Sequence, residues 1–380
     1  MEYDPKGMPF RRLGRSGLRV PVFSLGGWLT FGATVKGDPV KEIIKTAYEN
    51  GINFFDTAEG YESGECEREM GRVIKELGLK RTDLVISTKL YFWWKGKDPN
   101  YGGLSRKHII EGTKASLERL QLDYVDVIFA HRPDPTGTKA SLERLQLDYV
   151  DVIFAHRSDP TVPMEEVVRA FNFVIEKGWA FYWATSEWSA REIEEAYHVA
   201  DKLNLIPPIA EQCEHHMFHR ERPEGEFAPI YAKYGIGTTV WSALASGLLT
   251  GKYRGGNIPP GSRFDKNKDF FKGTIEGFRT ESGRRQFEKI DQLTDLAEKE
   301  LGCKLNHLAL AWVAKQPNTS TVILGASRPE QVIDNLKALE VLPKLTPEVL
   351  DKIEKILENK PKTETAHARP PLDETFKALY

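Results

Sequence analysis

Residues Gly112–Thr136 read GTKASLERLQLDYVDVIFAHRPDPT, and this stretch decides the fold class. Its first half has the spacing of an amphipathic helix, and Tyr124–His131 is a short, apolar, β-branched strand pattern. The stretch recurs as Gly137–Thr161 with one change, from Pro133 to Ser158. A unit of one helix and one strand, present in only two copies, is too short to indicate a solenoid.

Similar strand and helix patterns alternate along the rest of the chain. The other predicted strands are Val20–Gly26, Ile52–Thr57, Leu84–Lys89, Ala180–Thr185, Ala210–Cys213, Gly237–Trp241 and Thr321–Leu324. Helical patterns lie near residues 40–50, 65–77, 105–120, 163–177, 190–203, 225–233, 284–301, 305–315 and 329–338. Eight such steps, with no two adjacent strands, predict a (β/α)8 TIM barrel rather than a doubly wound sheet. The length would allow two domains, but we expect one domain over residues 1–380, with its core at about 18–345.

Three segments lie outside this alternation. Phe10–Val20, with two glycines, predicts an N-terminal hairpin ahead of the barrel. Lys252–Thr280, rich in Gly, Pro and charge, predicts a long loop and a candidate lid. The polar tail Lys360–Tyr380 is expected to be mobile.

The repeat leaves open which copy belongs to the barrel. In a barrel, a unit of one helix and one strand leaves the C-terminal face and returns to the same face. We therefore expect the extra copy to be extruded there as an insertion, without adding a ninth strand. Keeping the first copy preserves a helix that begins near Ser105 and buries two isoleucines, worth roughly 3–6 kcal/mol. This favours His131 over His156 as the histidine that enters the barrel mouth. A third register keeps the first helix and the second strand, but it must open the tight turn at Gln121–Asp123.

Bulk properties exclude several classes of protein. The net charge of −2 gives no basic field for nucleic acid. The longest apolar runs are strand-sized, so we expect no membrane insertion. The three cysteines are far apart and the first residues lack the apolar stretch of a secretory signal, so we expect a cytoplasmic protein.

Polar side chains at the ends of successive strands predict a catalytic site at the barrel mouth. Asp56 ends one strand, Tyr61 lies in the loop that follows, and Lys89 ends the next strand. An ammonium group beside a phenol favours the phenolate and lowers its pKa, which would make Tyr61 a better general acid. Asp56 would hold Lys89, and His131 (or His156) would orient a carbonyl. Taken alone, Asp56 and Tyr61 read equally well as a helix cap and a packing residue.

The sequence resembles the aldo-keto reductases. The resemblance extends from about Phe10 to Lys360, apart from the duplicated copy, and rests on INFFDTAEGY, LVISTK, FYWATSEWS, EQCEHHMF, WSALASGLLTGKY and ILGASRPEQVIDN. Within that family the chain is most similar to the branch that contains the β-subunits of voltage-gated potassium channels and their plant and fungal relatives. The resemblance implies a catalytic tetrad of Asp56, Tyr61, Lys89 and a histidine. The animal subunits have asparagine where His131 stands, so the histidine favours an active reductase.

The resemblance also implies NADPH or NADP⁺ as cofactor, bound across the barrel mouth. No GxGxxG motif follows a strand, so a Rossmann site is unsupported. The cofactor-binding residues implied are Trp28, Asp56, Ser186, Gln212, Trp241, Ser242, Leu244, Ser246, Lys252, Arg263, Gly325, Ser327, Arg328, Gln331, Asp334 and Asn335. Of these, Ser186 and Gln212 would hold the nicotinamide amide and Trp241 would stack on its ring. Independently, GAS before a helix is an anion-site pattern. Glu187 stands where the animal subunits have arginine.

Two hypotheses of function follow. The first is an NADPH-dependent carbonyl reductase acting on aromatic or hydrophobic aldehydes and ketones, with Trp28 and Tyr91–Trp94 walling an apolar pocket. The second is an auxiliary subunit that binds a potassium channel and senses NADPH, for which a homotetramer would be the assembly. Cys213, His215, His216 and His219 lack any standard zinc spacing, so we expect no metal.

Overall fold

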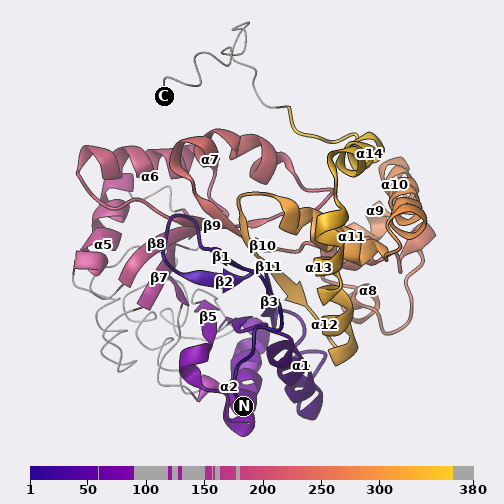
Figure 1. The fold of residues 1–380 in the computed structure, drawn as a ribbon, viewed down its shortest axis with the longest axis horizontal. Coiled ribbons are helices and arrows are strands. Elements are labelled where there is room, and N and C mark those ends of the chain that lie inside the picture. Colours follow the sequence, from indigo (N-terminus) through magenta and orange to yellow (C-terminus); the bar gives the residue numbers. More distant parts are fainter. Residues whose placement is uncertain are drawn as a thin grey trace, which may run out of the picture.

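Nine parallel strands form a closed barrel (Figure 1) in the computed structural model, which describes residues 1–58, 60–89, 119–121, 127–130, 150–155, 157–158, 163–176 and 180–362. The barrel strands are β3 (Phe23–Gly26), β4 (Phe54–Asp56), β5 (Val85–Lys89), β6 (Val127–Ala130), β7 (Val150–Ala155), β8 (Ala180–Ser186), β9 (Ala210–Glu214), β10 (Gly237–Trp241) and β11 (Thr319–Gly325). Each strand pairs with its neighbour in chain order, and β11 closes the ring between β10 and β3. The predicted barrel class is confirmed.

The strand count corrects the prediction for the repeat. Both copies supply a strand, β6 from the first and β7 from the second, and these pair in parallel from Val127↔Val152 to Ala130↔Ala155. The prediction of an extruded copy that adds no ninth strand was therefore wrong. That prediction asked which copy is extruded, and it did not compare extrusion with the entry of both copies into the sheet. Extrusion leaves an apolar strand and its backbone hydrogen-bonding groups in water, whereas entry into the sheet satisfies both.

Helices cover the outside of the barrel, with α5 and α6 on the left of Figure 1 and α10 to α14 on the right. They are α1 (Asp38–Glu49), α2 (Glu65–Leu77), α5 (Met164–Glu176), α6 (Ala190–Lys202), α7 (Ala228–Tyr234), α10 (Glu281–Glu300), α11 (Leu305–Lys315), α12 (Pro329–Leu336), α13 (Ala338–Val341) and α14 (Pro347–Leu357). The predicted helix over residues 105–120 lies mostly outside the described residues.

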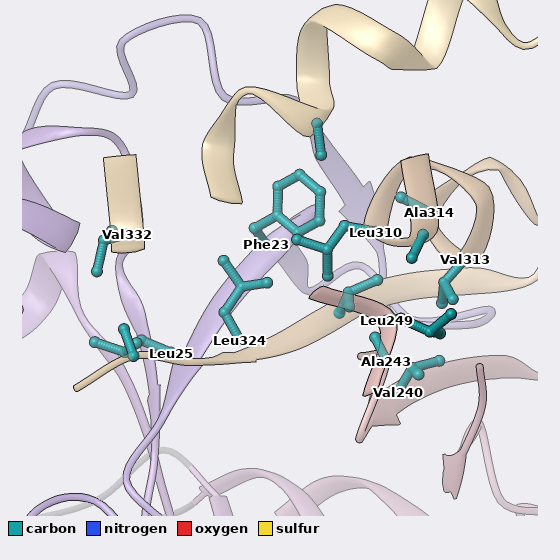
Figure 2. Close-up of a cluster of buried hydrophobic side chains, with 14 of the residues drawn as sticks. Phe23, Leu25, Val240, Ala243, Leu249, Leu310, Val313, Ala314, Leu324 and Val332 are labelled. Carbon is teal, nitrogen blue, oxygen red and sulfur yellow. The ribbon is translucent and has the colours of Figure 1, made fainter. Parts of the chain in front are cut away.

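Helix α11 is almost entirely buried. Residues Leu305 to Ala314 are all buried, so the helix is enclosed on every side instead of having one exposed polar face. Figure 2 shows its side chains Leu310 and Val313 in the cluster that contains Phe23 of β3 and Leu324 of β11. This packing fixes the strands that carry much of the predicted cofactor site.

The predicted N-terminal hairpin is present as β1 (Phe10–Arg12) and β2 (Arg19–Pro21), which pair antiparallel. It covers the amino-terminal end of the barrel. Arg11 Nη1 donates to the carbonyl oxygen of Thr319, at the start of β11, over 2.6 Å. Gly14 has a φ of +55°, and a Cβ on it would lie 1.9 Å from the carbonyl oxygen of Ile209, just before β9. The hairpin therefore packs at the end of the barrel opposite to the one at which the predicted site residues stand.

Residues 252–280 are more ordered than the predicted loop. The segment contains the 3₁₀ turn η5 (Arg254–Gly256) and the short helices α8 (Arg263–Lys266) and α9 (Lys272–Gly277). Phe264 is fully buried and packs on Tyr253 with ring centroids 4.4 Å apart. The predicted mobile tail falls outside the described residues from position 363 onward. Within the part of the chain described, no helix has the length and apolar character needed to cross a bilayer.

Candidate active site

The predicted site residues meet at the carboxyl end of the barrel. Asp56, Lys89, Ser186 and Trp241 are the last residues of β4, β5, β8 and β10. Parallel strands in one barrel end at one face, so the structure brings these positions to one rim. The pairing Asp56↔Ser87 sets β4 and β5 side by side there.

Asp56 and Tyr61 share one electrostatic environment. Asp56 is buried, and Tyr61 begins the 3₁₀ turn η1 (Tyr61–Gly64) directly beyond the strand. Burial raises the pKa of the Tyr61 phenol well above its ordinary value of 10.0, and the negative charge of Asp56 raises it further. The Lys89 side chain lies outside the described residues. Whether the Lys89 ammonium lowers the pKa of Tyr61 therefore stays a prediction.

Cys66 is a neighbour of this pair that the sequence interpretation missed. Its buried thiol accepts a hydrogen bond from Thr57 Oγ1 over 3.1 Å, and its charge, if ionised, would also raise the Tyr61 pKa. A Cβ on Gly27 would lie 2.3 Å from Cys66 Sγ. The backbone after β3 thus packs directly against the thiol. A Cys one position into a helix gave no signal that could have indicated this contact.

The two candidate histidines lie outside the described residues, but their surroundings are partly defined. His131 follows β6, whose residue Phe129 pairs with Lys89 of β5. His156 follows β7 and precedes Arg157. The Arg157 guanidinium acts to lower the pKa of Tyr61, so the end of the second copy also reaches the phenol. Arg157 was not among the predicted site residues.

Ser186, Gln212 and Trp241 come from three consecutive strands. Ser186 Oγ donates to the carbonyl oxygen of Gln212 over 3.1 Å, and Arg157 Nη1 donates to Ser186 Oγ over 3.3 Å. The Gln212 side chain is buried, and its Nε2 donates to Thr239 Oγ1 over 3.3 Å. The ends of β8 and β9 are therefore tied together at the predicted nicotinamide position.

The segment after β10 has an unusual backbone. Ser242 and Ser246 have φ values of +61° and +57°, and Leu244 between them precedes the 3₁₀ turn η4 (Ala245–Thr250). Left-handed conformation in non-glycine residues is costly and concentrates at ligand-binding sites. The Lys252 ammonium lies 4.9 Å from the centre of the Tyr253 ring, beside this turn.

Trp28 and Arg263 connect the loop after β3 to the segment 252–280. The Arg263 guanidinium lies 5.2 Å from the centre of the Trp28 ring, and Nη2 approaches the Trp28 carbonyl oxygen at 3.5 Å. Phe270, 64% exposed, packs edge-on against Trp28 with ring centroids 5.8 Å apart. Sequence reasoning placed Trp28 and Arg263 in the site but missed Phe270.

Just before the start of α12 lies the GAS segment from which the sequence predicted an anion site. Gly325 ends β11, and Arg328 is exposed directly before the helix. Ser327 donates to Gln331 Oε1 through its backbone N–H (2.7 Å) and through its hydroxyl (3.0 Å). The Ser327 amide is thus already bonded and Pro329 has no N–H, so binding of a phosphate at this helix start stays a prediction.

Asp334 and Asn335 are held by the protein itself. Asp334 Oδ1 accepts from Lys304 Nζ over 2.8 Å, and Oδ2 accepts from Asn306 Nδ2 over 3.0 Å. Asn306 Nδ2 also donates to Asn335 Oδ1 over 3.1 Å, and Asn335 is buried. These bonds tie α12 to α11, so the predicted adenosine contacts of both residues compete with structural ones.

Two histidines of the His and Cys cluster at the end of β9 pair with carboxylates. His215 Nε2 lies 2.9 Å from Glu224 Oε1, and burial lowers the pKa of His215. His216 Nε2 lies 3.3 Å from Glu214 Oε1. Across the described ranges, no group of three or more His, Cys, Asp or Glu side chains is arranged to hold a metal ion.

Comparison with known proteins gives consistent matches. The profile of the Aldo/keto reductase family matches residues 23–138 and 136–358, two segments that meet where the two copies of the repeat join. A probable voltage-gated potassium channel subunit beta from Arabidopsis thaliana is 47% identical over 93% of this chain and 98% of its own length. A putative subunit of the same name from Schizosaccharomyces pombe is 49% identical over 93% of this chain and 95% of its own. A probable voltage-gated potassium channel subunit beta from Oryza sativa subsp. japonica is 46% identical over 93% of this chain and 98% of its own length.

Proposed function

Because this chain belongs to the aldo/keto reductase family, we propose that it reduces aldehydes and ketones to alcohols with NADPH, Tyr61 acting as the general acid. Family membership supports oxidoreduction. The observation that carries the finer proposal is the phenol of Tyr61, which interacts with Asp56 at the carboxyl end of the barrel. The relevant substrates are aromatic or hydrophobic carbonyl compounds, in keeping with Trp28 and Phe270 at that rim.

The residues present fit a dinucleotide. The exposed start of α12, with Ser327 and Arg328, suits a phosphate, and Arg328 would favour NADP over NAD. Lys252 and Arg263 would hold the pyrophosphate. Trp241, Ser186 and Gln212 would hold the nicotinamide. When bound, the cofactor supplies the hydride.

The protein supplies the proton and the orientation of the carbonyl. Since burial and Asp56 raise the pKa of Tyr61, its hydroxyl stays protonated at neutral pH and can donate to the carbonyl oxygen. Lys89, held by Asp56, would stabilise the phenolate that remains. We propose that His131 orients the carbonyl, because the strand before it pairs with β5. His156 is the alternative, supported by the effect of Arg157 on Tyr61.

The test is NADPH oxidation with 4-nitrobenzaldehyde, followed by absorbance. Tyr61→Phe removes only the hydroxyl, and we expect kcat to fall by about 10²–10⁴. His131→Asn should lower the rate and His156→Asn should not; the reverse would assign the second copy. Equal rates for the parent and Tyr61→Phe would refute the acid role.

A second candidate function is supported by the names of the relatives, which describe potassium channel β-subunits. In this role the chain would form a homotetramer in the cytoplasm, bind a channel and sense NADPH. Light scattering would give a particle of four 43.1 kDa chains, larger when a cytoplasmic channel domain is added. An unchanged mass on mixing would count against channel binding.

A further inference from the structure

Glu187, directly after β8, joins the ends of three neighbouring strands. Its Oε1 accepts the backbone N–H of Glu214 over 2.8 Å and the indole Nε1–H of Trp241 over 2.9 Å. Glu214 and Trp241 are register partners at the ends of β9 and β10. A single carboxylate oxygen therefore fixes the relative position of these two strand ends and the direction of the Trp241 ring.

The rest of Glu187 is held equally firmly. Its Oε2 pairs with Arg222 Nη1 over 2.9 Å, and the same nitrogen approaches the Glu187 carbonyl oxygen at 3.3 Å. The backbone N–H donates to the carbonyl oxygen of Gln212 over 3.0 Å. Glu187 has a φ of +55°, a left-handed conformation that is unfavourable for a non-glycine residue. Strain of this kind persists where the surroundings fix the residue, often at a functional site.

We propose that Glu187 is a positioning residue, which holds the Trp241 indole in the orientation that receives the nicotinamide ring. The consequence for NADPH rests on the proposed function. Trp241 is only partly buried, so the hydrogen bond from its indole to Glu187 adds to whatever packing holds its ring. A carboxylate can accept both N–H groups, whereas an arginine at this position has donors only. Arginine at position 187 is therefore incompatible with this way of holding Trp241.

The first test observes Trp241 directly, without cofactor. Among the indole N–H resonances of the eight tryptophans in a ¹⁵N-labelled protein, Trp241→Phe assigns the one of interest. We expect Glu187→Ala to displace that resonance and Glu187→Gln to keep it close to the parent position, because the amide oxygen still accepts. Glu194→Ala is the matched control, since it removes a carboxylate bonded to Lys233 and Tyr234 instead. A resonance unmoved in Glu187→Ala overturns the inference.

The second test measures NADPH binding by calorimetry. Glu187→Ala removes the hydrogen bond between the Trp241 indole and the charged carboxylate, so we expect its Kd for NADPH to rise about tenfold or more. In Glu187→Gln, which keeps an acceptor, the rise should be less than about threefold. The double variant Glu187→Arg, Arg222→Glu restores the ion pair but leaves no acceptor at position 187 for the Trp241 indole. Its Kd for NADPH should therefore match that of Glu187→Ala. A Gln variant as weak as the Ala variant, or a charge-swapped pair as tight as the parent, overturns the inference. If the parent itself binds no NADPH, the proposed function fails, and the indole resonance alone decides whether Glu187 holds Trp241.

Discussion

Tyr61 is subject to opposing influences at the scale of single residues. Desolvation and the Asp56 charge raise its pKa, and Arg157 acts to lower it. The sequence predicted only the lowering, through Lys89. Sequence identifies which charges share a rim, but the balance among them depends on the depth of the phenol in the protein, which no local pattern contains.

The pH dependence of reduction should reflect the raised pKa of Tyr61. A general acid with a raised pKa stays protonated as pH increases, so kcat/KM should stay level through neutral pH and decline only above the ordinary phenol value of 10.0. A pH profile of NADPH oxidation checks this, with Tyr61→Phe as the baseline. A decline between about pH 7 and 9 would indicate that Lys89 outweighs burial.

Glu211 gives a second prediction at this scale. It is fully buried on β9 and accepts from Thr185 Oγ1 over 2.5 Å, and burial raises the pKa of its carboxyl well above 4.5. The folded state therefore keeps this proton where the unfolded state releases it, so stability falls as pH rises above 4.5. Glu211→Gln keeps the acceptor without the titration. We expect its Tm to exceed that of the parent by a few degrees at pH 8 and by less at pH 4.5, measured by circular dichroism. An equal difference at both pH values would contradict a neutral Glu211.

At the scale of elements, the local patterns located the strands and helices well. The predicted strand Gly237–Trp241 matches β10, and the predicted helix over 65–77 matches α2. Longer-range packing explains the departures. Segment 252–280 folds into short helices because Phe264 finds a buried site against Tyr253, a contact that its Gly and Pro content does not reveal.

The hairpin gives a prediction for an element. Gly14→Ala should destabilise the protein by about 2–4 kcal/mol, because the new Cβ meets the Ile209 carbonyl oxygen as well as an unfavourable φ. Gly7→Ala is the control. Gly7 also has a positive φ of +77° but nothing lies within 4 Å of its Cβ position, so it should cost only about 1 kcal/mol. Urea unfolding midpoints compare the two, and equal costs would argue against the hairpin packing described.

At the scale of the whole molecule, the repeat changes the size of the barrel. Two identical strands in register between β5 and β8 give nine strands where eight were expected. The ends of β4 and β8 therefore lie further apart along the rim than in an eight-stranded barrel. These two strands lead to Tyr61 and to Ser186, two residues of the proposed site.

Deleting residues 137–161 should therefore restore an eight-stranded barrel, raise turnover with 4-nitrobenzaldehyde and raise Tm. Deletion of residues 112–136 is a close control, because the two products differ only in proline or serine at one position. Both deletions should behave alike. If neither changes turnover or Tm relative to the parent, the ninth strand leaves the site undisturbed.

The sequence by itself determined the barrel class, the alternation of strand and helix, and which polar residues stand at strand ends, because these follow from periodicity within short segments. Only the tertiary structure decided that both copies enter the barrel and that Glu187 spans three strand ends. It also decided that Cys66 and Arg157 act on Tyr61. These outcomes depend on how segments far apart in the chain share burial and hydrogen bonds, and such competition is settled only when the sheet closes.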